Sequence, residues 1–174
     1  MKNLFNAICI LLFLTSCGQI VPLKGSYPTS AYKETINKPI DQVWDNLIDI
    51  IADYGYEPNS LDKNSGFMAI RSVRIADEDV TIEDKKGAPL KPNALVITEK
   101  LDFDDKRSVI AYNRIESGWN VRLRSLEENK TLVSVFLYNI NVNRPEIQET
   151  KTIRTHLRAY SLHNFEKMIV GRLK

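Results

Sequence analysis

The stretch INKPIDQVWDNLIDIIADYGYEPNSLDKNSGFMAI, Ile36 to Ile70, is the most regularly patterned part of the chain and decides the fold. Its first half predicts an amphipathic helix, because apolar residues recur every three or four positions and acidic residues occupy most of the others. Pro39 suits the first helical position, which needs no backbone N–H. Gly55 can adopt the left-handed conformation that ends a helix. The apolar face comprises Ile40, Val43, Trp44, Leu47, Ile50, Ile51 and Tyr54.

The second half of this stretch predicts a β-hairpin. Tyr56 to Leu61 and Phe67 to Val73 are separated by Asp-Lys-Asn-Ser-Gly, a turn rich in residues that tolerate positive φ. Before the helix, Ala31 to Ile36 alternates enough to predict a strand. The domain is therefore expected to begin with a strand, a helix and a hairpin.

Further along the chain, strand patterns dominate until a second helix. Ile75 to Asn93 is polar and rich in turn residues, and predicts a long loop with a short strand near Val80 to Ile82. Two hairpins are predicted from the strand pairs Ala94–Phe103 with Ser108–Ile115 and Trp119–Ser125 with Thr131–Val142. A helix is predicted from Thr155 to Leu173. The expected fold class is α+β, with an antiparallel sheet packed against an early helix and a C-terminal helix.

The quoted stretch resembles the opening of helix-grip domains, in which a strand leads into a helix carrying Val-Trp and then into a hairpin with Asp-Lys and Ser-Gly at its turn. SLHNFEKMIVGRLK, Ser161 to Lys174, resembles their closing helix. Two branches fit. One is the small domain of bacterial envelope lipoproteins of the BamC (NlpB) kind, an accessory of outer-membrane protein assembly. The other is the Bet v 1/START-like superfamily, whose cavity between sheet and helix holds apolar ligands. Neither resemblance implies catalytic residues.

The N-terminus predicts secretion and lipidation. Lys2 precedes an apolar run, Phe5 to Leu14, and a run of about ten residues is too short to span a bilayer as a helix, which needs about 20. Such a start is typical of a cleaved signal peptide. Leu14-Thr15-Ser16-Cys17 resembles the lipobox of bacterial lipoproteins. In that family the thiol at the position of Cys17 receives a diacylglyceryl group, the preceding peptide is removed, and the new amino group is usually acylated as well.

These features divide the chain into a signal peptide over residues 1–16, a lipidated Cys17 with a flexible tether over residues 17–30, and a domain over residues 31–174. The tether is expected because Gly18 to Thr29 contains two prolines and two glycines and shows no period. In enterobacterial lipoproteins an aspartate directly after the cysteine retains the protein at the inner membrane, and here that position is Gly18. Some other bacteria export lipoproteins to the cell surface with an acidic run just after the cysteine, and residues 18–26 contain no acid. We therefore expect a protein of the bacterial outer membrane that faces the periplasm.

The composition argues against a nucleic-acid partner. The chain has 24 Lys and Arg residues against 22 Asp and Glu residues, a formal net charge of +2, whereas proteins that bind nucleic acids normally carry a basic excess. Cys9 and Cys17 are the only cysteines. Because cleavage removes the first and lipidation consumes the second, we expect no disulfide in the mature chain.

The sequence shows no catalytic, metal or cofactor motif. It lacks the G-x-S-x-G elbow, the G-x-G-x-x-G fingerprint and the phosphate-binding P-loop. His156 and His163 are the only histidines; on the predicted helix they would lie roughly 10 Å apart, too far to share one metal ion. The acidic runs 77–79 and 102–105 lack the ligand spacing of a calcium loop. We expect a protein without catalytic activity, metal or cofactor.

Four aromatic residues form the first candidate site. Trp44, Phe67, Phe136 and Phe165 would line an apolar cavity between the sheet and the C-terminal helix if the domain carries a ligand. Dense packing around them would favour an interaction module instead.

Three arginines form the second candidate site. If Arg71, Arg122 and Arg124 lie on the outer face of one sheet, they would contact lipid headgroups, peptidoglycan carboxylates or an acidic envelope protein. The alternative is a solvated face on which acidic residues pair with them across strands. The function expected from the sequence is a lipid-anchored binding or assembly module of the cell envelope, and the alternative is a carrier of an apolar ligand.

Overall fold

The computed structural model of the protein describes residues 19–102, 114–148 and 151–174. The predicted signal peptide and Cys17 lie outside these residues. The described elements are β1 (Gln19–Val21), β2 (Tyr32–Ile36), α2 (Ile40–Asp53), β3 (Pro58–Asp62), β4 (Phe67–Ile75), a 3-10 turn η1 (Asp77–Asp79), β5 (Val80–Thr81), β6 (Val96–Thr98), β7 (Lys100–Asp102), β8 (Arg114–Glu127), β9 (Lys130–Gln148), β10 (Lys151–Leu157), β11 (Ala159–Ser161) and α3 (Asn164–Leu173). Their order and pairing confirm the predicted α+β class.

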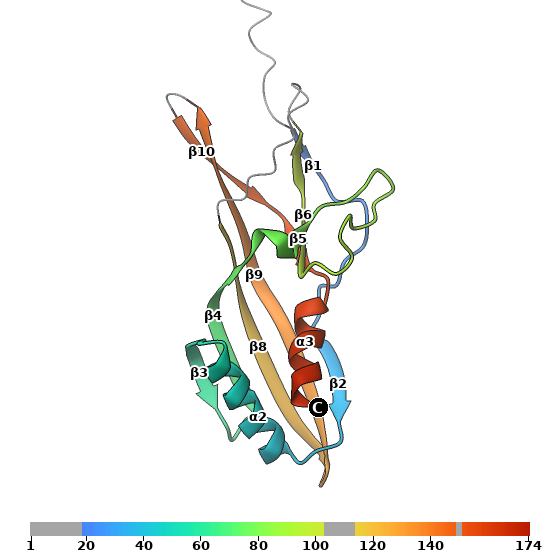
Figure 1. The fold of residues 1–174 in the computed structure, drawn as a ribbon, viewed down its shortest axis with the longest axis vertical. Helices are drawn as coiled ribbons and strands as arrows, with labels where there is room; N and C mark the ends of the chain where they lie inside the picture. The colour runs from blue at the N-terminus through green and yellow to red at the C-terminus, as the bar shows by residue number, and fades with distance from the viewer. Residues whose placement is uncertain (1–18, 103–113, 149–150) are drawn as a thin grey trace, which may run out of the picture.

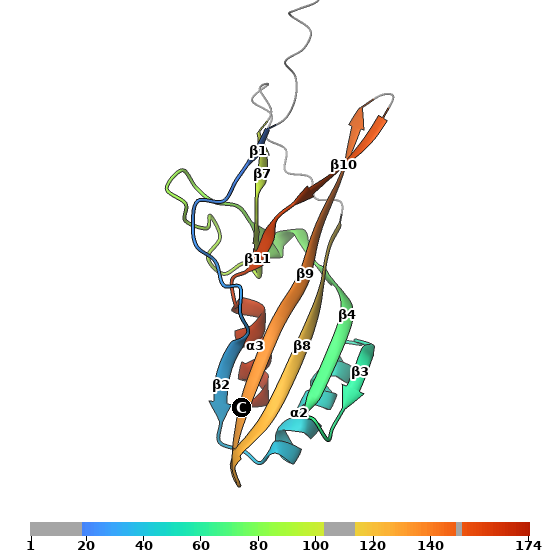
Figure 2. The same ribbon diagram turned by 180° about the vertical axis from the view of Figure 1, so that it is seen from behind.

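The main sheet has six strands and is organised around the long strand β9. On one side of β9 lies β8, followed by β4 and β3; on its other side β2 pairs with residues 131–135 and β10 with residues 142–148. Every one of these pairings is antiparallel. Both helices lie on the same face of this sheet (Figure 1). The view from behind shows that no drawn helix covers the other face (Figure 2). This is the predicted helix-grip arrangement.

The early helix follows the sequence prediction closely. α2 begins after Pro39 and ends before Gly55, whose φ of 65° is the left-handed value that glycine adopts most easily. Five residues of its apolar face are buried: Val43, Trp44, Leu47, Ile50 and Ile51. Burial of each large apolar side chain contributes roughly 1.5–3 kcal/mol, so this face holds α2 on the sheet.

The C-terminal helix is shorter than predicted. The helix expected from Thr155 is wrong over its first nine residues, because the chain there forms β10 and β11 and α3 begins only at Asn164. β10 pairs with the upper half of β9, and β11 pairs with β6. The core-facing residues Phe165, Ile169 and Leu173 are buried as predicted. His156 therefore lies in β10, and His163 precedes α3 with a φ of 64°.

Two small sheets stand above the helices at the upper end of the molecule. β6 pairs with β11 and, in parallel, with β5; β7 pairs with β1. One strand is predicted over Ala94–Phe103, but the structure divides it into β6 and β7, which pair with segments distant in sequence. Most of its predicted hairpin partner lies outside the described residues. The predicted short strand within the loop 75–93 is confirmed as β5.

The main sheet bends at Gly118. Opposite this glycine, the β4 register shifts between Ile70 and Val73, and the β9 register shifts between Tyr138 and Asn141. Such bulges bend a strand locally. A Cβ atom at Gly118 would lie 2.5 Å from the Tyr138 ring, so any other residue there would require this ring to move. The bend separates a large core beneath the helices from a smaller core around Ile115 and the small sheets.

Candidate functional site

The four aromatic candidates do not surround one cavity. Trp44 and Phe165 are 5% and 4% exposed and belong to the large core beneath the helices. Phe67 lies directly opposite Arg122 on β8, and Phe136 lies opposite Asn120. Because the buried residues of these strands occupy the alternate positions, Phe67 and Phe136 lie on the helix-free face. The sheet therefore separates the two pairs.

An apolar cleft nevertheless opens at the bend of the sheet, between the two cores. It has a volume of about 290 Å³, and its lining includes Tyr54, Tyr56, Leu137, Phe165 and Met168. Arg74 and Asp79 supply polar groups to it. Of the predicted aromatic residues only Phe165 contributes to this lining. Sequence reasoning missed the other contributors because they come together from distant segments: the residues just after α2, β4, η1, the residue before β6, β9 and α3.

The arginine candidates are better placed than the aromatic ones. Arg122 and Arg124 are exposed, alternate with buried residues of β8, and so share the helix-free face with Phe67 and Phe136. The residues directly opposite Arg122 are Phe67 on β4 and Ser134 on β9, and the residue opposite Arg124 on β9 is Leu132. None of these residues is acidic. The register therefore does not give Arg122 and Arg124 the acidic partners across the strands that the alternative interpretation expects. Arg71 is exposed within the β4 bulge, outside this regular alternation.

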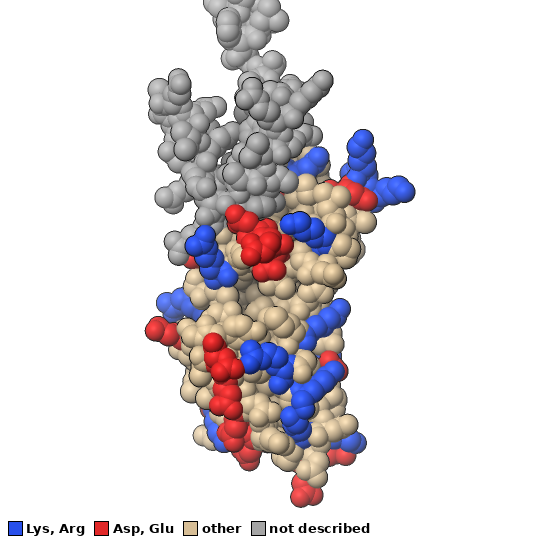
Figure 3. All heavy atoms as spheres, in the orientation of Figure 1, with Lys and Arg blue, Asp and Glu red and all other residues tan. Residues whose placement is uncertain are grey.

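On the opposite, helix-bearing face, Figure 3 shows a compact acidic patch in the region of η1 and interspersed positive and negative side chains below it. Figure 3 also shows Lys or Arg side chains projecting at the upper right, from the region of the loop that follows β5. This loop meets the N-terminal segment, and the two enclose a second cavity of about 470 Å³. Lys24, Glu83, Asp84, Lys85 and Lys100 are among the residues that line it.

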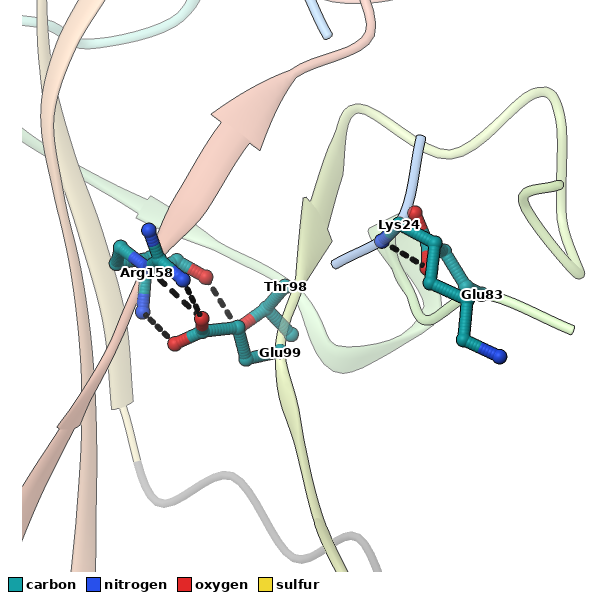
Figure 4. Close-up of polar contacts among 5 residues, drawn as sticks. All are labelled: Lys24, Glu83, Thr98, Glu99 and Arg158. Atoms are coloured by element: carbon teal, nitrogen blue, oxygen red, sulfur yellow. Dashed lines mark hydrogen bonds and ion pairs between the residues drawn. The ribbon is translucent and has the colours of Figure 1, made fainter. Parts of the chain in front are cut away.

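Glu83 binds the N-terminal segment to the loop. Its carboxylate accepts hydrogen bonds of 2.7 Å from the backbone N–H groups of Lys24 and Gly25, and another of 2.7 Å from the Tyr27 hydroxyl. Figure 4 shows the contact with Lys24. Residues 19–27, within the segment for which we expect a flexible tether, therefore contain β1 and dock on the domain. No sequence pattern marks Glu83, because its partners lie more than 50 residues away.

Two shifted pKa values reflect this contact. Burial raises the pKa of the Tyr27 hydroxyl, and the hydrogen bond to Glu83 raises it further. For Glu83, burial raises the pKa, but the hydrogen bonds from Tyr27, Lys24 and Gly25 outweigh it and the net pKa is lowered. A carboxyl whose pKa is lowered by folding contributes stability above its ordinary pKa of 4.5 and loses that contribution as the pH falls through the lowered folded value.

We expect a Glu83→Gln substitution to loosen the N-terminal segment while leaving the main sheet intact. Hydrogen bonds to a charged group contribute about 1.5–3 kcal/mol. Hydrogen exchange at the amides of Lys24 and Gly25 should therefore accelerate by about tenfold or more. Acidification below pH 4.5 should loosen the unsubstituted segment in the same way. The measurement is exchange of a peptide covering residues 22–27. The control is Glu127→Gln at the distant β8–β9 turn, and equal exchange in the two variants would contradict the assignment.

Two further carboxyl groups, at Glu99 and Glu166, are buried but structural. Glu99 is 4% exposed and binds Arg158, with its Oε1 2.6 Å from Nη2 and 2.8 Å from Nε (Figure 4). This pair joins the β6–β7 connection to the β10–β11 connection. The carboxyl of Glu166 accepts hydrogen bonds from the Ser161 hydroxyl, at 2.7 Å, and from the N–H of Leu137, at 3.3 Å. Each carboxyl group therefore stabilises a contact between distant segments of the fold.

Three further observations on the described residues concern metal binding, His163 and membrane insertion. Within residues 19–102, 114–148 and 151–174, no group of three His, Cys, Asp or Glu side chains could hold a metal ion. His163 Nε2 lies 2.9 Å from the carbonyl oxygen of Ser30, so this ring contacts the segment that precedes β2. Neither described helix is both long enough and apolar enough to cross a membrane.

Comparisons with known proteins add little. No protein-family model matches the chain, and no curated protein matches it. One solved structure that resembles it is the Zhui aromatase/cyclase from Streptomyces sp. R1128, which is 15% identical, with 90% of this chain and 87% of that chain covered and a TM-score of 0.25. At this TM-score the two chains share little geometry, and the likeness supports neither a substrate nor an activity.

Proposed function

We propose that this chain is a bacterial lipoprotein that acts, without catalysis, as a binding or assembly module of the cell envelope. Acyl chains on Cys17 hold it at the outer membrane, and the domain faces the periplasm. Confinement to a surface raises the effective concentration of the domain toward its neighbours, so weak contacts become useful. The resemblance of Ile36–Ile70 to the envelope lipoproteins of the BamC kind supports the same class.

The observation that carries this proposal is Leu14-Thr15-Ser16-Cys17 at the end of a short apolar run. Each part has a role in lipidation: Lys2 orients the leader, the run is too short to remain as a membrane span, and the small residues 15 and 16 admit the peptidase before the cysteine. If this N-terminal segment were instead a buried helix of the domain, nothing would require these three features to occur together.

The helix-free face of the main sheet is the binding surface that the structure supports best. It combines the half-buried rings of Phe67 and Phe136 with the exposed guanidinium groups of Arg122 and Arg124. Aromatic residues and arginine are enriched at protein interfaces, where they contribute most of the binding energy. Because no acid lies directly across the strands from either arginine, an acidic partner would supply the missing counter-charges.

Crosslinking in living cells tests this surface. We expect a photoreactive phenylalanine at Arg124 to capture a defined envelope component, and Arg122→Glu in the same chain to abolish the capture. The matched control places the photoreactive group at Asp49, which is exposed on α2 of the other face. Identical products from positions 124 and 49, or capture that survives Arg122→Glu, would contradict a binding role for this face.

A carrier of an apolar ligand is the second candidate, and the cleft of about 290 Å³ favours it. Its volume is at the lower end of the range of small-molecule sites, roughly 300–1,000 Å³. Its wall includes Tyr54, Tyr56 and Phe165, which offer flat apolar surfaces. Saturable binding of an apolar fluorescent dye that is lost in Met168→Arg would favour a carrier over a module that binds through the sheet.

A further inference from the structure

We propose that the upper end of the domain, formed by β1 and the loop 82–91, rests directly on an anionic lipid surface. This inference deepens the proposed function and rests on it, because it requires acyl chains on Cys17. It concerns a surface different from the helix-free face of the sheet, and it assigns an orientation to the domain: the small sheets point toward the membrane, and the β3–β4 turn points away from it (Figure 1).

The first argument is the distance between the anchor and the fold. β1 begins at Gln19, two residues after Cys17. An extended chain spans at most about 3.6 Å per residue, so the first paired residue lies within about 7 Å of the acylated cysteine. β1 is in turn fixed to β7, with Gln19 opposite Asp102 and Val21 opposite Lys100. The remaining tether is too short to lift this end of the domain clear of the lipid headgroups.

The second argument is charge. The two segments that form the proposed surface, residues 20–30 and the loop 82–91, contain four lysines and two acids: Lys24, Lys85, Lys86, Lys91, Glu83 and Asp84. The acids are turned toward the protein backbone, since Glu83 binds the N–H groups of Lys24 and Gly25 and Asp84 accepts from the N–H groups of Lys86 and Ala88 at 2.8 and 2.9 Å. The side chains of Lys85 and Lys86 are exposed. Lysines close to an anionic leaflet are attracted to it over about a Debye length.

The third argument is apolar exposure at the same end. Ile20 in β1 is 45% exposed, and Leu90 in the loop is 59% exposed. Large aliphatic side chains beside lysines are the combination by which interfacial segments insert among headgroups while their charges stay at the phosphate level. The cavity between the loop and the N-terminal segment is lined by three lysines, Lys24, Lys85 and Lys100, and by the two acids Glu83 and Asp84.

A spin label at residue 90 tests the orientation. The lipidated mature protein is reconstituted in nanodiscs of phosphatidylcholine with and without phosphatidylglycerol, and Leu90→Cys supplies the thiol for the label. The matched control is Leu61→Cys, which replaces a leucine of similar exposure, 55%, near the β3–β4 turn at the opposite end. We expect the label at residue 90, on discs with phosphatidylglycerol, to lose accessibility to a water-soluble nickel chelate, while the label at residue 61 remains accessible.

Charge reversal separates a lipid contact from mere proximity. Lys85→Glu with Lys86→Glu should restore nickel accessibility at residue 90, whereas Lys33→Glu with Arg124→Glu, an equal change in net charge on the sheet, should not. A label at residue 90 that stays as accessible as the one at residue 61, on protein whose acylation has been verified by mass, would overturn the docking surface alone. Isolation of the mature protein without acyl groups would overturn both this inference and the proposed function.

Discussion

A Cys17→Ser chain, exported behind a leader that ordinary signal peptidase removes, is expected to leave the membrane fraction completely in high-salt buffer. Burial of acyl chains contributes about 0.8 kcal/mol per CH₂, so two or more chains hold a protein on a bilayer almost permanently. The described residues contain no helix that could take over as a membrane span. High salt is part of the design because it screens the lysines around the loop 82–91. The measurement is the share of the protein in membrane pellets.

The matched control is Cys9→Ser, the other cysteine of the chain. Because residue 9 lies in the proposed leader, residues 1–16, this change should leave the mature protein in the pellet. Thermal unfolding of the released Cys17→Ser protein should match that of the unsubstituted protein after removal of its lipid, since residue 17 lies before the first described strand. A Cys17→Ser chain that still pellets in high salt would remove the basis of the anchoring proposal.

The largest effect on stability is expected from Trp119→Ala. Trp119 is fully buried in β8, where its neighbours across the strands are Ile70 and Leu137. Its ring packs edge-on against Phe165 of α3 at 5.1 Å and against Tyr56 at 6.0 Å between centroids. Removal of such a ring costs about 3–5 kcal/mol, which is a large fraction of the roughly 5–15 kcal/mol that holds a domain folded. Urea unfolding, followed by circular dichroism, measures the loss.

Trp119→Phe distinguishes the roles of volume and hydrogen bonding at this position. Among the described residues, the buried Nε1 of Trp119 has no hydrogen-bond partner, and leaving a buried donor unpaired costs about 1–3 kcal/mol. Phenylalanine removes that donor, so it should destabilise far less than alanine does. The exposed control Leu126→Ala, at a side chain 53% exposed, should change stability by less than about 0.5 kcal/mol. An alanine variant at residue 119 as stable as this control would show that the core beneath the helices is assigned wrongly.

The part of the fold that the sequence predicts well is the part stabilised by local patterns. The helix around Trp44 and the turn before Phe67 combine periodicity with end signals within a few residues of one another. The first strand and the hairpin of β8 with β9 are likewise recognisable from alternation and a short polar turn. In these segments, local propensity and tertiary structure agree.

Where local pattern and tertiary pairing disagree, the prediction fails. Residues 155–161 were compatible with a helix by spacing, but their backbone pairs with β9 and β6 instead. The β-branched Thr152 and Ile153, just before that region, and Thr155, at its start, favour an extended strand. The pairing partners lie far away in sequence, since Tyr160 is opposite Ile97. A single sequence gives no signal for pairings of that range.

The candidate sites show the same limit. Alternation placed Arg122 and Arg124 together correctly, because a strand's period of two determines which residues share a face. It could not reveal that Phe67 and Phe136 lie on that face, away from the helices that carry Trp44 and Phe165, because this depends on which face of the sheet the helices cover. Glu83 escaped notice for another reason: its partners, among them Tyr27, come from a segment that composition describes as a tether.

The most direct test of the account is the intact mass of the mature protein isolated from the cells that produce it. We predict a chain that begins at Cys17 and is heavier than its polypeptide by a diacylglyceryl group and a further acyl chain. A mature chain with a free thiol at Cys17, or one that retains residues 1–16, would contradict the central claim.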